Sequence, residues 1–128
     1  MAKKIILTEA APAPIGPYSQ AVAVGDLVFL SGQIPLDPKT GDLVETDIET
    51  ATQRVLDNIL AVLSAEGLSF RHVVKTTVFM SDLSLFARMN SVYARAFPDN
   101  PPARSTVQAA ALPKGVSVEI EVVAARSA

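Results

Sequence analysis

Residues 117–125 read Ser-Val-Glu-Ile-Glu-Val-Val-Ala-Ala. Apolar residues at every second position alternate with Glu119 and Glu121, the pattern of a β-strand whose successive side chains point to opposite faces of a sheet. One face of the strand is wholly apolar, and the other face carries the two acids. The stretch therefore predicts a sheet strand with one core-facing side and a pair of half-buried carboxylates on its other side.

Other strands are expected on both sides of two helical segments. Val73–Met80 is rich in Val, Thr and Phe, which favour strands, and Ala103–Gln108 is expected to be a further strand. Ala21–Val24 and Leu27–Ser31 form a predicted hairpin. The two residues between them, Gly25-Asp26, suit a tight turn because glycine adopts the positive φ that such turns need.

The helical segments lie between these strands. Asp47–Glu66 has apolar residues at helical spacing, and Thr46 with Glu49 forms a candidate capping box at its start. Gly67 follows the last turn, where a left-handed residue is expected. A second helix is expected at about Leu83–Phe97.

The resulting element order, ββ(β)αβαββ, indicates an α+β fold with a mixed β-sheet and two helices on one face. The 128 residues suit a single domain, 1–128. The strand Leu27–Ser31 is apolar on both faces, and 49% of all residues are apolar. Because two helices cover only one face, we expect another subunit to bury the second face.

Composition and charge exclude several classes of protein. The 11 basic and 13 acidic side chains give a net charge of −2, which argues against a nucleic-acid partner. With no cysteine and only His72, the chain lacks disulfides, thiolate sites and histidine-pair metal sites, and it shows no cofactor motif. His72 is expected at the surface or as a cap. No apolar stretch approaches the roughly 18 residues of a membrane span, so a cytoplasmic protein without membrane contact is expected.

Arg104, at the head of its strand, is the candidate partner for the acids. Half-buried carboxylates need a nearby cation or hydrogen-bond network, since burying a charge without a partner is costly. One interpretation is an ion pair of Arg104 with Glu119 or Glu121 that holds the sheet or a subunit contact. The other is that Arg104 binds a ligand carboxylate with its planar fork while a nearby glutamate handles protons.

Three other sites allow both a structural and a binding interpretation. Tyr18, in a rigid turn after Pro17, is either a core anchor or a ligand contact. Ser31-Gly32 ends a strand, where a bulge or a close approach of a ligand to the backbone is expected. Asn90 lies in mid-helix, where asparagine is unfavourable unless it faces solvent or makes a specific hydrogen bond.

Several motifs together resemble the RidA family, also called the YjgF or reactive-intermediate deaminase family. They follow the family order over nearly the whole chain. The matching stretches are Ile15–Ala21, Val28–Pro35, Val74–Phe79, Met89–Tyr93, Pro102–Val107, Leu112-Pro113 and Val118–Glu121. The Ser-Gly-Gln and Pro-Ala-Arg-Ser segments in combination are the most specific of these.

The resemblance implies a chorismate-mutase-like fold and a homotrimer with its sites between subunits. It also implies an enzyme, a 2-iminobutyrate/2-iminopropionate deaminase that hydrolyses 2-imino acids and their enamine tautomers, such as 2-aminoacrylate. The products would be 2-keto acids and ammonia. No metal or cofactor is implied, because an iminium carbon is already electrophilic.

The resemblance also implies roles for individual residues. Arg104 matches the family arginine that holds the substrate carboxylate, and Glu119 matches the carboxylate that positions the attacking water. The remaining substrate-binding positions correspond to Tyr18, Ser31, Gly32, Asn90 and Thr106. Thr106 replaces a cysteine found in many members, but its backbone amide can still contact a ligand.

Two alternatives stay open at this point. The trimer could bind a carboxylate ligand or a protein partner in a regulatory role, without turnover. It could also resemble those family relatives that cleave messenger RNA and inhibit translation, although the net charge of −2 makes this less attractive.

Overall fold

A mixed sheet of six strands forms the centre of the computed structural model, which describes residues 2–128. The strand order is β1-β2-β3-β6-β4-β5, and every neighbouring pair is antiparallel except β4 and β5, which run parallel. The strands are β1 (Lys4–Ile6), β2 (Ala21–Val24), β3 (Leu27–Gln33), β4 (Val73–Met80), β5 (Ala103–Gln108) and β6 (Val118–Ala125). This arrangement confirms the predicted α+β class.

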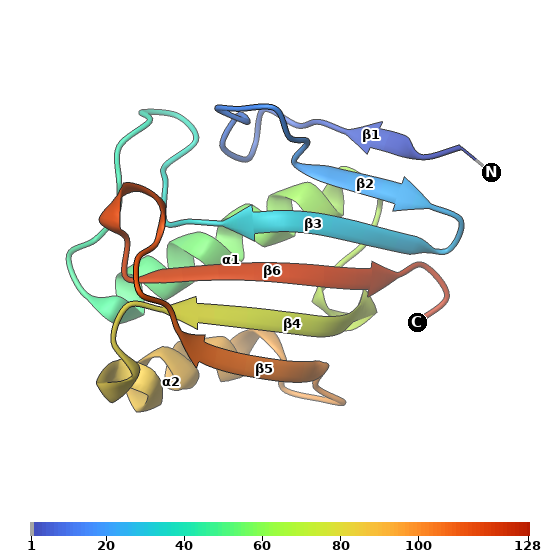
Figure 1. The fold of residues 1–128 in the computed structure, drawn as a ribbon. Coiled ribbons are helices and arrows are strands. Elements are labelled where there is room, and N and C mark those ends of the chain that lie inside the picture. The colour runs from blue at the N-terminus through green and yellow to red at the C-terminus, as the bar shows by residue number, and fades with distance from the viewer. Residues whose placement is uncertain (1) are drawn as a thin grey trace.

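Two α-helices, α1 (Ile48–Ser64) and α2 (Phe86–Ala96), cover the same face of the sheet (Figure 1). Short 3₁₀ turns at Phe70–His72, Leu83–Leu85 and Pro113–Gly115 connect the larger elements. The predicted second helix is therefore divided, because its first turn is the 3₁₀ segment before α2. Among the described residues, neither α-helix is long and apolar enough to cross a membrane.

The cap of α1 differs from the prediction. The N-cap is Asp47, and its Oδ1 accepts a hydrogen bond from the Thr50 backbone N–H at 2.6 Å. The proposed capping box of Thr46 with Glu49 is wrong. Asp47 has the extended backbone of a cap residue, so its carboxylate, one position later, reaches the free N–H groups of the first turn. At the other end Gly67 adopts φ +71°, as expected.

The strand β1 is not among the strands expected from the sequence. Its three residues pair with β2, from Lys4 opposite Ala23 to Ile6 opposite Ala21. Only Ile6 is buried, so the strand exists through backbone pairing with a preformed edge rather than through a strong sequence pattern of its own.

The hydrophobic core lies between the sheet and the two helices. The core-facing residues of β6, Val118, Ile120, Val122 and Ala124, are at most 2% exposed. They pack with buried residues such as Leu56, Ile59, Met80 and Met89. The opposite face of the sheet is uncovered in a single chain. Large apolar side chains remain exposed there or at its edges, with Leu27 at 39%, Phe29 at 44% and Val107 at 43%. Leu27–Ser31 thus has the second apolar side that the sequence predicted.

Candidate active site

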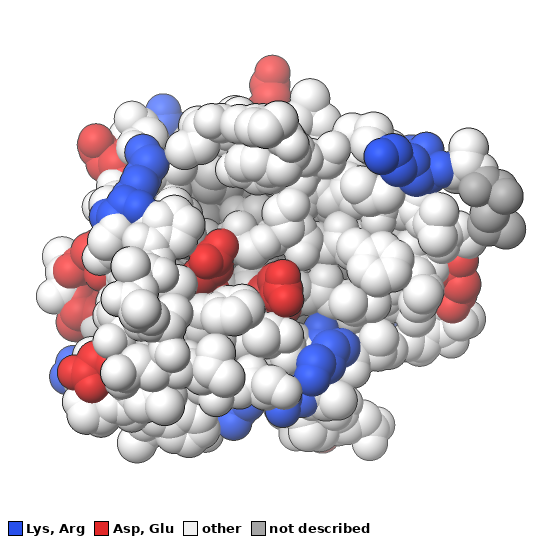
Figure 2. All heavy atoms as spheres, viewed as in Figure 1, with Lys and Arg blue, Asp and Glu red and all other residues white. Residues whose placement is uncertain are grey.

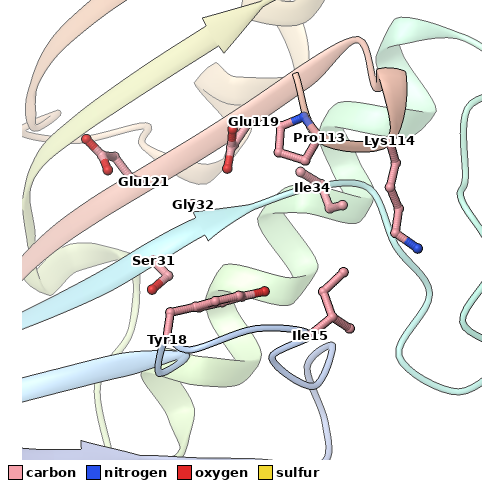
Figure 3. A pocket seen from close by; sticks show the side chains of 9 residues that line it. All are labelled: Ile15, Tyr18, Ser31, Gly32, Ile34, Pro113, Lys114, Glu119 and Glu121. Carbon is pink, nitrogen blue, oxygen red and sulfur yellow. The ribbon is translucent and has the colours of Figure 1, made fainter. Parts of the chain in front are cut away.

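The uncovered face of the sheet is hollowed where β3 and β6 run side by side near the end of β3 (Figure 3). The cavity has a volume of about 440 Å³. Its lining comes from the N-terminal segment, from β3, from the 3₁₀ turn before β6 and from β6 itself. The lining residues are Ile15, Tyr18, Ser31, Gly32, Ile34, Pro113, Lys114, Glu119 and Glu121.

Glu119 packs directly against Gly32 in this cavity. A Cβ added to Gly32 would clash with Glu119 Oε2 and lie 2.8 Å from Cδ and 3.0 Å from Cγ. The β3–β6 register is irregular between Leu30 and Gln33, and this irregularity coincides with the close approach. The irregular register agrees with the bulge expected at Ser31-Gly32. The group that lies against Gly32 is the Glu119 side chain of the same chain, and the close approach of a ligand stays a prediction.

Burial raises the pKa of the Glu119 carboxyl, and the negative charge of Glu121 on the same face raises it further. Within residues 2–128, no hydrogen bond or ion pair reaches the Glu119 side chain. A carboxylate in this setting exchanges protons closer to neutral pH than an exposed glutamate does. It can therefore act as a general base.

Tyr18 and Ser31 form one wall of the cavity. The Tyr18 side chain is 51% exposed, and its ring lies between Ser31 and Ile15 in Figure 3, so Tyr18 is not a core anchor. Its backbone N–H donates to the Gly16 carbonyl at 2.8 Å, which tightens the turn that presents the ring. The Ser31 hydroxyl donates to the Ser19 carbonyl at 2.6 Å. Its oxygen can still accept hydrogen bonds from other donors.

Gln20 is a supporting residue that the sequence analysis missed. It is 1% exposed, and its Oε1 accepts from the Thr8 N–H at 2.7 Å while its Nε2 donates to the Thr8 and Pro12 carbonyls, both at 2.9 Å. These bonds hold the proline-rich segment that carries Ile15 and Tyr18. A polar residue at the start of an apolar strand was the available signal.

Arg104 lies in a second hollow, on the helix side of the sheet. Its Nη1 donates to Asn90 Oδ1 at 2.7 Å, and its Cζ lies 4.7 Å from the ring centre of Tyr93 and 5.3 Å from that of Phe86. All three partners belong to α2. The hollow has a volume of about 400 Å³, and its lining residues are Asn90, Tyr93, Ala94, Phe97, Pro101, Pro102 and Arg104.

The predicted ion pair of Arg104 with Glu119 or Glu121 does not form within one chain. The salt bridges among the described residues involve other groups. The reason is topological. The strand β4 lies between β5 and β6, and Arg104 contacts α2 on the covered face while Glu119 lines the cavity on the uncovered face. Asn90 proves to be a hydrogen-bond partner rather than a solvent-facing residue.

Thr106 and His72 are the remaining residues for which the sequence suggested a role. The Thr106 hydroxyl is buried and makes no hydrogen bond to the described part of the chain, and Thr106 lines neither cavity. His72 Nδ1 accepts from the Ser69 N–H at 3.0 Å, so the expected capping role is confirmed. Within residues 2–128, no group of three or more His, Asp or Glu side chains could hold a metal ion.

These features define an α+β protein with a half-buried carboxylate in one surface cavity. A second hollow holds a partly buried arginine that has no carboxylate partner among residues 2–128. A family model described as "Endoribonuclease L-PSP" matches residues 8–126. This match and the relatives named next show that the chain belongs to the RidA family, as its motifs indicated.

Curated relatives and solved structures agree with this membership. A RutC family protein of Pyrococcus abyssi is 52% identical, covering 97% of this chain and 98% of its own. A 2-iminobutanoate/2-iminopropanoate deaminase of Salmonella typhimurium is 48% identical, covering 96% and 98%. RidA from an Antarctic Psychrobacter is 44% identical, with a TM-score of 0.91 and coverage of 95% and 98%. E. coli TdcF with bound serine is 46% identical, with a TM-score of 0.92 and coverage of 96% and 98%.

Proposed function

We propose that this chain hydrolyses 2-imino acids, including 2-iminobutyrate and 2-iminopropionate, to 2-keto acids and ammonia. The observation that carries the proposal is the Arg104 guanidinium, which is partly buried and has no carboxylate partner among the described residues. The Salmonella relative, whose name states this activity, supports it at 48% identity. The serine bound to TdcF supports an α-amino acid-like ligand with a carboxylate.

Arg104 is suited to hold the carboxylate of the substrate. One hydrogen bond goes to Asn90, and the rings of Phe86 and Tyr93 contact the guanidinium. The remaining donors form a planar fork that fits two carboxylate oxygens. A substrate carboxylate would supply the counter-charge that Arg104 lacks in the described part of the chain.

Glu119 is suited to activate water. In the proposed reaction, water attacks the imine carbon while Glu119 accepts a water proton and the C=N bond becomes a C–N bond. Glu119 returns this proton to the nitrogen. The C–N bond then breaks as ammonia leaves, the hydroxyl gives its proton to the again ionised Glu119, and the C=O bond of the keto acid forms. Because the iminium carbon is electrophilic, positioning and proton transfer are sufficient for this reaction.

One small substrate cannot reach Arg104 and Glu119 of the same chain, because the two cavities that hold these residues lie on opposite faces of the sheet. A second copy that places its β5–α2 side against the uncovered face would bring its Arg104 to the first copy's Glu119. The two contacting surfaces would differ, and such heterologous contacts close into a ring when the rotation allows it. The exposed Leu27, Phe29 and Val107 supply apolar area for this contact. We therefore propose a homotrimer with sites between subunits.

The test is turnover of an imine made in the assay. A serine dehydratase releases 2-aminoacrylate from serine, and the rate of pyruvate formation from the released imine is followed with and without the purified protein. An acceleration that is proportional to protein concentration and absent in Arg104→Ala supports the proposal. A rate equal to spontaneous hydrolysis at all protein concentrations, with keto-acid binding retained, would favour the non-catalytic ligand-binding trimer.

An endoribonuclease function remains a second candidate because the family model carries that description. On the face shown in Figure 2, acidic side chains lie near the centre and basic ones form separate groups toward the margins. A continuous basic track for an RNA backbone is absent from this face. A salt-dependent shift of RNA on a native gel, followed by RNA cleavage, would support this candidate.

A further inference from the structure

We propose that Tyr93, held in place by Thr76, is a positioning residue that sets the orientation of the Arg104 guanidinium for the ligand carboxylate. The inference rests on the proposed function for its ligand, although the contacts that carry it belong to this chain alone. In the structure the Tyr93 ring is 5% exposed, yet it also lines the hollow that holds Arg104.

The stripe of α2 that faces Arg104 consists of Phe86, Asn90 and Tyr93. These positions are four and three residues apart, so they lie on one side of the helix. The Tyr93 ring centre is the nearer of the two aromatic contacts, at 4.7 Å from Cζ, and Asn90 Oδ1 accepts the hydrogen bond from Nη1. Two rings and one acceptor together fix both the place of the guanidinium and the direction of its free donors.

Thr76 connects this ring to the strands. Thr76 is 0% exposed, and its Oγ1 lies 2.7 Å from the Tyr93 hydroxyl. It is also the register partner of Arg104 in the parallel β4–β5 pair. The hydrogen bond therefore ties the ring on α2 to the strand pair that carries the arginine. Because Thr76 lines neither cavity, any effect of its hydroxyl on a bound ligand must pass through Tyr93.

A purely structural role predicts a different outcome. Tyr93 also packs against Phe97, with ring centres 4.8 Å apart, and Phe97 packs against Phe70 at 5.3 Å. If Tyr93 served the core alone, its replacement would lower stability and leave ligand affinity unchanged. Phe70→Leu is the matched control, because it removes a ring from the same aromatic cluster without a contact to Arg104.

The experiment compares Tyr93→Leu, Tyr93→Phe and Thr76→Val with Phe70→Leu in the full-length protein. We measure the Kd of 2-oxobutanoate by calorimetry, KM and kcat for the imine, and the melting temperature. Tyr93→Leu should weaken Kd and raise KM by about tenfold through loss of the cation–π contact, with a smaller change in kcat. Tyr93→Phe keeps the ring but loses the hydrogen bond to Thr76, so it should loosen the Arg104 NMR signal and weaken Kd by no more than about threefold. Thr76→Val should match Tyr93→Phe, and Phe70→Leu should change only the melting temperature.

Two further readouts separate this inference from the proposed function. In an Arg104→Lys background, Tyr93→Leu should cause much less additional loss of affinity, because the planar group that it positions is gone. Without any ligand, the Arg104 Nε–H signal in NMR should be sharp in the wild type and broadened in Tyr93→Leu. If the wild type neither binds 2-oxobutanoate nor hydrolyses imines, the proposed function is wrong, and the NMR signal still decides the positioning.

The inference is overturned if the Kd of Tyr93→Leu stays equal to that of Phe70→Leu, or if the Arg104 signal is the same in wild type and Tyr93→Leu. Should Tyr93→Leu fail to fold, Tyr93→Phe and Thr76→Val decide the question. A loosened Arg104 signal in these two variants supports the inference, and an unchanged signal overturns it.

Discussion

The Glu119 carboxyl group occupies the space that any side chain on residue 32 would need. With a Cβ on Gly32, Cδ of Glu119 would lie only 2.8 Å away and Cγ 3.0 Å away, which is closer than real Cβ contacts allow. The glycine is therefore required by a neighbouring strand rather than by its own backbone angles. Because Gly32 has no side chain, the Glu119 side chain has room in the cavity.

Gly32→Ala should consequently reduce turnover more than it reduces stability. The added methyl group displaces the Glu119 carboxylate from its place, and loss of a well-placed general base costs about 10²-fold or more. The measurement is kcat together with the melting temperature. Gly16→Ala is the matched control, because its Cβ would meet Tyr18 at an ordinary contact of 3.6 Å. Equal activity of Gly32→Ala and wild type would contradict this account of Glu119.

Glu119→Gln should stabilise the protein at neutral pH while slowing turnover. Burial and the charge of Glu121 hold the pKa of Glu119 in the folded state above its ordinary value of 4.5. At pH values between the ordinary and the raised pKa, the folded state therefore binds more protons than the unfolded state. Stability therefore falls as pH rises through this interval. The melting temperature of the variant should exceed that of wild type at pH 7.5, with a smaller difference at pH 4.

Ligand binding by Glu119→Gln should persist, since the amide fills the same space but cannot accept a proton from water. A variant that loses 2-oxobutanoate binding would show that Glu119 contacts the ligand directly. In the wild type, turnover should fall as pH is lowered through the raised pKa of Glu119. A pH-independent rate across this range would argue against Glu119 as the base.

Arg104→Ala should keep most of the stability and lose ligand binding. Among residues 2–128 of one chain, Arg104 has no acidic partner, so its removal leaves no buried carboxylate there uncompensated. Losing a charge-assisted contact to the ligand should cost about 1.5–3 kcal/mol, or roughly ten- to 150-fold in Kd. Arg104→Lys should recover little of this, because an ammonium lacks the planar pair of donors. A collapse in melting temperature with retained turnover would overturn the assignment.

Mixing Arg104→Ala with Glu119→Gln should restore activity if sites form between subunits. After unfolding and refolding together, about a quarter of the sites would combine an intact arginine from one chain with an intact glutamate from its neighbour. Light scattering should give three times the mass of one chain, and each inactive variant refolded alone is the control. Activity no higher than the sum of the two variants would show that each chain carries a complete site.

Local patterns in the sequence determined most of the elements. The two-residue alternation of β6, the helical spacing of α1 and the left-handed Gly67 each depend on neighbours along the chain, so they are visible without a structure. The candidate residues were also available from the sequence, through their motifs. The three residues of β1 carry too short a pattern, and the choice of Asp47 over Thr46 as the cap depends on one backbone conformation.

Only the tertiary structure shows on which face of the sheet each candidate residue lies and which residues it contacts. Arg104 and Glu119 looked like partners because half-buried acids need a nearby cation and Arg104 stands at the head of its strand. The sheet inserts β4 between these strands and turns the two side chains to opposite faces, where one meets the rings of α2 and the other meets Gly32. Strand order and facing are set by packing between distant segments. Local sequence patterns carry no information about this packing. The sequence therefore indicated which residues belong to the site but not which residues each of them contacts.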